Sequence, residues 1–177
     1  MRIHLGADHK GFALARQLES WLASEGHEVI NHGAAELDNG DDHTVFDILV
    51  SHAVIVDEDN ALETRGILVG GDGSGEVIAA NKVNGARAFT ALTTAQVQAA
   101  RANANANVLV IPADFVDLAT AKQLVASLVA TPFSYTIDAA RRIIQTNEYE
   151  NSQTIEGWNV ADEFQDSGLR YANPGSH

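Results

Sequence analysis

The chain of 177 residues contains no cysteine. Disulfide bonds, thiolate metal sites and a cysteine nucleophile are therefore excluded. The absence of cysteine is consistent with a cytoplasmic protein, which is the location that we expect. No apolar run approaches the roughly 18 residues of a membrane span, and the first residues run directly into a strand-like segment. We therefore expect neither a membrane segment nor a signal peptide.

Basic residues are scarce. The chain has 11 Lys and Arg against 24 Asp and Glu, which gives a formal net charge of −13. Binding to nucleic acid requires clustered Lys and Arg, whereas the basic residues here are scattered. We therefore expect no nucleic-acid partner. A small ligand, including an anionic one, can still bind where local groups outweigh the overall charge.

Short apolar strands alternate with amphipathic helices along most of the chain. The expected strands are 3–7, 27–31, 66–69, 86–90 and 107–111, and the expected helices are 12–22, 44–57, 77–82, 93–102, 115–129 and 137–145. This alternation is typical of a parallel sheet that is covered on both faces. With right-handed crossovers it predicts an α/β fold, a Rossmann-like three-layer αβα sandwich with five parallel strands, followed by a C-terminal helix and an extended tail. Ligands of such folds bind beyond the carboxyl ends of the strands.

The character of the sequence changes from about residue 146. The segment is polar and carries only a few large apolar residues, among them Trp158 and Phe164. We predict a domain at residues 1–145 and a C-terminal extension, 146–177, that packs on the domain or on a partner subunit. A further hypothesis is a structural dimer that is held together through this tail.

A glycine-rich loop lies between the third expected strand and the next helix. Four glycines occupy positions 70, 71, 73 and 75, and Glu76 follows them. Glycine leaves backbone N–H groups uncovered, and such groups at a helix N-terminus form an anion site. A carboxylate beside an anion site can remove a proton from carbon while the resulting oxyanion is held. A tight strand-to-helix turn, with Glu76 favoured in the first helical turn, explains the same residues.

Two segments together resemble the ribose-5-phosphate isomerase B / galactose-6-phosphate isomerase family. They are residues 6–12 (GADHKGF) and residues 71–88 (GDGSGEVIAANKVNGARA), and the resemblance covers roughly residues 1–145. It implies an aldose–ketose isomerase that uses no metal or organic cofactor and moves a proton between C1 and C2 through a cis-enediolate. It implies a small-molecule sugar or sugar phosphate as substrate. It also implies a homodimer, or a dimer of dimers, whose sites lie between subunits.

The resemblance also assigns roles to residues. One branch of the family uses a Cys on the strand before the glycine loop as the base, and the other uses a Glu at the end of the loop. This chain has Val69 and Gly70 in the first region and Glu76 at the second position, so it resembles the Glu branch. The resemblance implies that Asp8 and His9 bind the sugar. It further implies that the loop holds the enediolate through Gly71, Gly73, Ser74 and Gly75.

Three positions of the reaction site depart from the family pattern. Asp72 stands where the family usually has Ser or Thr, and an ionised carboxylate there would repel an enediolate unless it turns away, is protonated or meets a different group of the substrate. His43 stands where the family commonly has Tyr. Asn103 stands where the family has a His that assists ring opening. Asn103 can form hydrogen bonds but cannot take a proton, so ring opening lacks its acid or base unless His43 supplies it.

The expected phosphate site departs most. Asp114 occupies the position of an Arg after the fifth strand, and Asp138 occupies one of two Arg positions on the last helix, where Arg142 remains. At an effective dielectric constant near 20, each misplaced charge pair at ~4 Å costs about 4 kcal/mol. We therefore expect an altered substrate specificity. The alternative is a non-catalytic sugar-binding or regulatory protein on the isomerase scaffold, which Asp72 and Asn103 favour.

Overall fold

The structure, a computed structural model, describes residues 1–154 of the chain. It divides into two compact units, of which the first is Met1–Tyr135 and the second begins at Thr136. The first unit holds the sheet and five helices, and the described part of the second unit holds one helix. Trp158 and Phe164, on which the predicted tail contact depends, lie outside the described residues.

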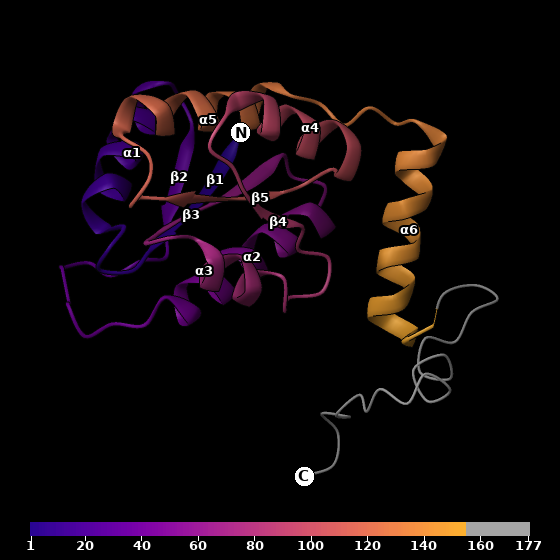
Figure 1. Ribbon diagram of the computed structural model, residues 1–177, viewed down its shortest axis with the longest axis horizontal. Coiled ribbons are helices and arrows are strands. Elements are labelled where there is room, and N and C mark those ends of the chain that lie inside the picture. Colours follow the sequence, from indigo (N-terminus) through magenta and orange to yellow (C-terminus); the bar gives the residue numbers. More distant parts are fainter. Residues whose placement is uncertain (155–177) are drawn as a thin grey trace, which may run out of the picture. The chain divides into compact units, whose positions relative to one another are not determined.

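The first unit is a five-stranded sheet between two layers of helices (Figure 1). The strands are β1 (Arg2–Ala7), β2 (Glu28–Asn31), β3 (Thr64–Gly70), β4 (Ala88–Thr90) and β5 (Val108–Pro112), and the helices are α1 (Phe12–Ser24), α2 (His43–Asp59), α3 (Ser74–Ala80), α4 (Thr94–Ala104) and α5 (Leu118–Ala130), with α6 (Ile137–Ser152) in the second unit. All neighbouring strands are parallel, in the order β2-β1-β3-β5-β4. The predicted fold class is confirmed.

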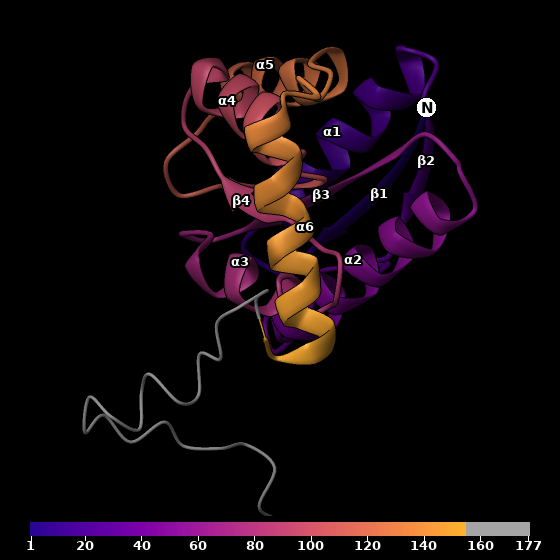
Figure 2. The same cartoon turned by 90° about the vertical axis from the view of Figure 1, so that its right-hand side faces the viewer.

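The two faces of the sheet pack against different helices. Helices α1, α4 and α5 cover one face, whereas α2 and α3 cover the other (Figures 1 and 2). Successive residues of β3 alternate between the two cores: Ile67 and Val69 pack with residues of α1 and α5, and Leu68 packs with Val50 and Val54 of α2. Burial on both faces explains why the strands read as continuous apolar runs rather than as alternating patterns.

Several element boundaries differ from the sequence-based expectation. Helix α3 begins at Ser74, three residues earlier than expected, so Glu76 lies in its first turn. Helix α5 begins at Leu118 rather than at residue 115, because the side chain of Asp117 accepts a hydrogen bond from the Thr120 N–H and caps the helix there. Helix α6 continues to Ser152, so the predicted domain boundary at residue 145 lies inside a helix.

Strands β1 and β3 are neighbours at the centre of the sheet, and the chain leaves them in opposite directions. Strand β2 lies beside β1, whereas β5 and β4 lie beyond β3. Such a switch point opens a crevice at the carboxyl ends of the strands. The turn after β1 comes very close to β3, because a Cβ at Gly11 would lie 1.9 Å from the backbone oxygen of Val69. None of the helices in the described part of the chain has the length and apolar character needed to cross a membrane.

Candidate active site

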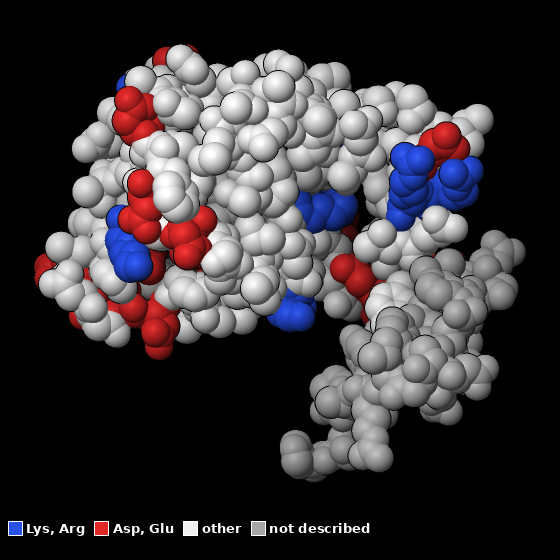
Figure 3. Space-filling view, in the orientation of Figure 1, with Lys and Arg blue, Asp and Glu red and all other residues white. Residues whose placement is uncertain are grey.

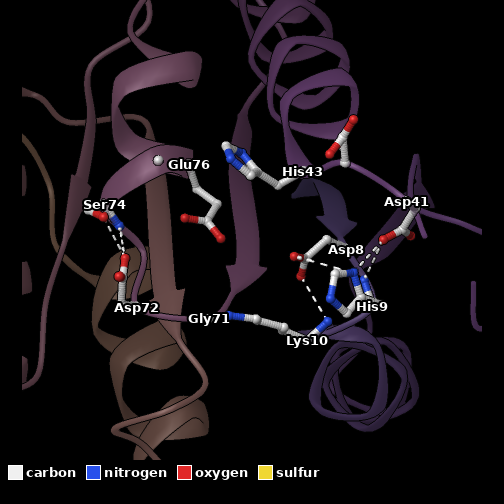
Figure 4. A pocket seen from close by; sticks show the side chains of 11 residues that line it. Asp8, His9, Lys10, Asp41, His43, Gly71, Asp72, Ser74 and Glu76 are labelled. Carbon is white, nitrogen blue, oxygen red and sulfur yellow. Dashed lines mark hydrogen bonds and ion pairs between the residues drawn. The ribbon is translucent and has the colours of Figure 1, made fainter. Parts of the chain in front are cut away.

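A cavity of about 330 Å³ lies at this switch point. Three segments that are far apart in the sequence line it (Figure 4): the turn after β1 contributes Asp8, His9 and Lys10, the start of α2 and the loop before it contribute Asp41, Asp42 and His43, and the glycine loop with the start of α3 contributes Gly71, Asp72, Ser74, Gly75 and Glu76. The cavity therefore brings together most of the residues that the sequence singled out.

Glu76 is buried in the wall of the cavity, with 5% of its surface exposed. Its carboxylate lies directly against the Cα of Gly70, since a Cβ at that position would lie 1.6 Å from Oε1 and 2.4 Å from Cδ of Glu76. Val69, in contrast, packs into the core on the α1 side of the sheet. A side chain at position 70 would therefore occupy the space that the Glu76 carboxylate fills. No side chain of residues 1–154 forms a hydrogen bond or ion pair with this carboxylate.

His43 and Asp47 form a pair in the first turns of α2. Nδ1 of His43 lies 2.6 Å from Oδ2 of Asp47, which is one helical turn away, and the Asp47 side chain is 2% exposed. The hydrogen bond that His43 donates to Asp47 raises the pKa of His43 above its ordinary value, and the nearby Glu76 and Asp8 carboxylates act in the same direction. Burial raises the pKa of Asp47 to about 6. Gly75 gives the imidazole its room, because a Cβ there would lie 2.8 Å from both Cε1 and Nε2 of His43.

Asp8, His9 and Asp41 form the opposite wall. Oδ1 of Asp8 accepts hydrogen bonds from the backbone N–H groups of Lys10 and Gly11, which fixes the turn after β1. Oδ1 of Asp41 accepts the backbone N–H of His9 at 2.9 Å and lies 2.8 Å from its Nδ1. The side-chain hydrogen bond between Nδ1 of His9 and the Asp41 carboxylate raises the pKa of His9 above its ordinary value. Oδ2 of Asp41 is buried and has no hydrogen-bond partner within residues 1–154.

Asp72 is turned back onto its own loop. Its Oδ1 accepts hydrogen bonds from the backbone N–H of Ser74 at 2.8 Å and from the Ser74 hydroxyl at 2.5 Å (Figure 4). These bonds lower the pKa of Asp72, so the side chain is ionised at neutral pH. The structure therefore favours the alternative in which Asp72 turns away from the substrate, because Ser74 holds its side chain.

Three residues of the cavity, Lys10, Asp41 and Asp42, were not singled out from the sequence. Lys10 reaches across to Gly71, where a Cβ would lie 2.8 Å from Cδ and 3.2 Å from Nζ of Lys10. It is the only Lys or Arg among the described residues that line the cavity. Asp41 belongs to the acidic run DNGDD at residues 38–42. Lys10 and Asp41 make their contacts with residues far away in the sequence. No local sequence pattern predicts these contacts, although Lys10 directly follows the Asp8-His9 pair.

Three predicted site residues lie elsewhere in the chain. Gly73 adopts a φ of +84° and packs toward Val110 and Thr90, so it does not line the cavity. Asn103 is exposed in the last turn of α4, which runs back from the carboxyl ends of the strands toward the opposite edge of the sheet. Arg142 is exposed on α6 in the second unit. A single copy of the first unit therefore does not bring Asn103 to Glu76.

The acidic residues that replace the expected phosphate-binding arginines have different surroundings. Asp114 lies beside the glycine loop, since its backbone N–H donates to the Gly71 carbonyl at 3.1 Å and its Oδ2 would lie 3.3 Å from a Cβ at Gly71. Asp138 pairs with Arg141 on α6, at 3.0 Å.

Carboxylates also gather at the end of the first unit toward which β5 points (Figures 1 and 3). Within residues 1–154, no group of three or more His, Asp or Glu side chains is arranged to hold a metal ion.

Comparison with known proteins identifies the family. The family model described as Ribose/Galactose Isomerase matches residues 3–146. The chain belongs to the ribose/galactose isomerase family. The family predicted from the two sequence segments is thereby confirmed.

Individual relatives agree with the family model. Ribose-5-phosphate isomerase B of Mycolicibacterium paratuberculosis is 39% identical over 152 residues, which cover 86% of this chain and 93% of the relative. The Escherichia coli protein of the same name is 34% identical over 124 residues, which cover 70% of this chain and 80% of the relative. These similarities show an aldose–ketose isomerase.

Solved structures give the same result for the fold. The ribose-5-phosphate isomerase B of Mycoplasma genitalium, solved with bound ribulose-5-phosphate, superimposes with a TM-score of 0.79 at 30% identity and covers 85% of this chain and 97% of its own. The Clostridium thermocellum protein of the same name also has a TM-score of 0.79, at 32% identity, and covers 87% of this chain and 100% of its own.

Proposed function

We propose that this isomerase moves a proton between C1 and C2 of a small sugar, with Glu76 as the base. The observation that carries the proposal is the Glu76 carboxylate, which is buried in the cavity wall, held against Gly70 and free of hydrogen-bond partners in the described residues. A base must lie within reach of the proton that it removes and must not be engaged by another group. The burial of Glu76 in the cavity wall beside the glycine loop, and its lack of a partner in the described residues, support this role.

The oxyanion of the enediolate is held by backbone amides of the glycine loop in this proposal. The Ser74 N–H is occupied by Asp72, so the amides of Gly71 and Gly75, which also line the cavity, are the donors that remain. Fixed amide dipoles stabilise developing negative charge without reorganisation. Because Asp72 is turned onto Ser74, its charge is directed into the loop rather than at the substrate.

The sugar hydroxyls are bound on the opposite wall. The unpartnered Oδ2 of Asp41 is an acceptor for a hydroxyl group. Nδ1 of His9 is engaged with Asp41, and Nε2 of the imidazolium is a donor. Asp8 is occupied through Oδ1 by two backbone amides, which leaves Oδ2 for the sugar. A buried carboxylate oxygen without a donor is costly, and a sugar hydroxyl would satisfy it.

The substrate differs from that named for the relatives, which is ribose 5-phosphate. Five carboxylates line the cavity (Asp8, Asp41, Asp42, Asp72 and Glu76), and Asp114 lies beside the glycine loop, against one Lys in the lining. A phosphate dianion bound in the way that the resemblance implies would meet this acidic surrounding. We propose a sugar that is unphosphorylated or carries a different substituent, whose hydroxyl groups suit carboxylate acceptors.

We also propose a homodimer in which a second copy supplies Asn103 and Arg142. Neither residue lies in the cavity of the first unit. The outer face of α2 carries exposed apolar side chains at helical spacing, with Val45, Ile48, Leu49 and Val56 between 42% and 59% exposed. An apolar stripe of this kind is typical of an interface between proteins.

The experiment is an isomerisation assay with free and phosphorylated tetroses, pentoses and hexoses, together with deuterium exchange at C2 in D₂O. We expect exchange with at least one sugar in the parent enzyme, and a loss of about 10²–10⁴-fold in Glu76→Gln. An undiminished exchange rate in Glu76→Gln refutes the assignment of the base. Efficient turnover of ribose 5-phosphate at an ordinary KM refutes the altered substrate. Nothing in the site favours the non-catalytic alternative, since Glu76 is in place and Asp72 is held by Ser74.

A further inference from the structure

Isomerisation of an aldose needs acid–base chemistry on oxygen as well as on carbon. In water an aldose is mainly a cyclic hemiacetal, and the C2 proton becomes acidic only when the ring opens and C1 is a carbonyl. Glu76 is assigned to the proton on carbon. A second group must therefore move a proton from the anomeric hydroxyl to the ring oxygen.

The His43–Asp47 pair has the construction of an oriented acid–base group. Asp47 is almost completely buried, and its Oδ2 lies 2.6 Å from Nδ1 of His43. This contact makes Nδ1 the donor to Asp47 and leaves Nε2 as the nitrogen that can exchange a proton. A carboxylate that fixes the tautomer and the direction of an imidazole is a recurring arrangement in acid–base catalysis.

The free nitrogen of this pair is directed at the reaction site. Nε2 would lie 2.8 Å from a Cβ at Gly75, so it rests on the backbone of the residue that precedes Glu76. Figure 4 shows the imidazole of His43 and the side chain of Glu76 approaching each other from α2 and α3 in the cavity wall. A sugar whose C2 lies at Glu76 would thus have its anomeric centre within reach of the imidazole.

We infer that His43, positioned by Asp47, opens the sugar ring in this enzyme. The inference rests on the proposed function and adds the residue that prepares its substrate. The imidazolium gives the Nε2 proton to the ring oxygen while the C1–O bond breaks and its electron pair goes to that oxygen. The neutral imidazole then takes the proton of the anomeric hydroxyl as the C1 carbonyl forms. Protons and charge balance, and His43 returns to its starting state.

The electrostatic surroundings of His43 suit both steps. Asp47, Glu76 and Asp8 all face the imidazole, and their charges raise its pKa above the ordinary value. The raised pKa favours the imidazolium, the form that gives the proton to the ring oxygen. Asn103 cannot perform either step, because an amide neither gives nor takes a proton in this range.

The test compares a sugar that must open its ring with one that has none. Ribose 5-phosphate is a furanose, whereas ribulose 5-phosphate cannot close a furanose ring because its O5 carries the phosphate. Erythrose and erythrulose form an equivalent pair without phosphate. The two readouts are turnover of the aldose and deuterium uptake from D₂O at C1 of the ketose.

For His43→Asn we expect aldose turnover to fall by about 10²–10⁴-fold, while deuterium uptake by the ketose stays within about threefold of the parent. For Asp47→Asn we expect a fall of about 10–100-fold in aldose turnover. In that variant the part of the pH profile of aldose turnover that follows the protonation of His43 should move to lower pH. The reason is that the variant lacks the Asp47 carboxylate, which raises the pKa of His43. A merely structural role of Asp47 would not move that part of the profile. His27→Asn, at a histidine that precedes β2 and does not line the cavity, is the control and should stay within about twofold.

The outcomes separate this inference from the proposed function. Equal losses of aldose turnover and ketose exchange in His43→Asn overturn the ring-opening role, and so does undiminished aldose turnover. An Asp47→Asn variant whose pH profile does not move overturns the positioning role. Failure of the parent enzyme to exchange deuterium with any sugar of the full panel, the free and phosphorylated tetroses, pentoses and hexoses, refutes the proposed function itself.

Discussion

The contact between Gly70 and Glu76 allows the proposed base to be displaced without changing it. In Gly70→Ala the new Cβ would stand 1.6 Å from Oε1 of Glu76, whereas ordinary van der Waals contact begins at 3.4 Å. The carboxylate oxygen must therefore withdraw by about 1.8 Å. Gly70 is not among the glycines with positive φ, so its backbone accepts alanine. The substitution thus acts on the position of the carboxylate rather than on the main chain.

The magnitude follows from this displacement. A misplacement of about 1 Å in a reacting group costs about 10²-fold in rate, so a retreat of about 1.8 Å should lower kcat by about 10²–10⁴-fold. This loss corresponds to about 3–5 kcal/mol of transition-state stabilisation. Stability should hardly change, because alanine at a compatible glycine position gains about 0.4–1 kcal/mol from the unfolded chain. We therefore expect a Tm within about 4 °C of the parent.

The assay is deuterium exchange at C2 with the sugar that the parent turns over, together with thermal unfolding of each variant. Gly66→Ala is the matched control on the same strand. Its Cβ would lie 2.9 Å from Val108 and 3.1 Å from Val50 and Val54, in the core rather than in the cavity. Overpacking there should cost about 1–3 kcal/mol and lower Tm by about 2–10 °C with kcat unchanged. A Gly70→Ala enzyme with undiminished exchange would show that Glu76 is not the base.

Three further predictions concern the substrate, the assembly and the histidine of the opposite wall. Asp114→Arg should lower KM for ribose 5-phosphate by about tenfold or more in steady-state assays, because it replaces a repulsive charge beside the glycine loop; an unchanged KM contradicts the altered phosphate site. Ile48→Glu, on the apolar face of α2, should convert the proposed dimer into a monomer in light scattering, whereas Arg16→Glu should not. Asp41→Asn should lower the pKa of His9 toward its ordinary value in an NMR titration. The His9–Asp41 pair stabilises the fold fully below the unfolded-state pKa of His9 and loses this contribution as pH rises through the raised folded-state pKa, so the stability difference between parent and Asp41→Asn should shrink as pH rises.

The order of strands and helices was predictable because the central strands are continuous apolar runs and most helices have an amphipathic pattern. The ends of the elements were less predictable, since they depend on helix caps and on the path of the backbone. The Asp117 cap makes α5 begin at Leu118, and α3 begins already at Ser74, within the glycine loop. Local spacing predicted a site at the glycine loop and Glu76, and both line the cavity at the switch point. The contacts of Lys10 with Gly71 and of Asp47 with His43 are side-chain geometry, which the sequence pattern does not encode.

The positions of the two proposed acid–base groups are each set by the absence of a side chain at a glycine. The Glu76 carboxylate fills the space of a Cβ at Gly70, and the imidazole of His43 fills the space of a Cβ at Gly75. The identity of the base is therefore a property of two residues: a cysteine at position 70 and the carboxylate of Glu76 compete for one place. Gly70→Cys alone should remove the carboxylate from its position, and only a further truncation of Glu76 would leave the new thiol room beside the loop. One substitution cannot exchange the base here, because a side chain at position 70 and the Glu76 carboxylate would have to occupy the same space.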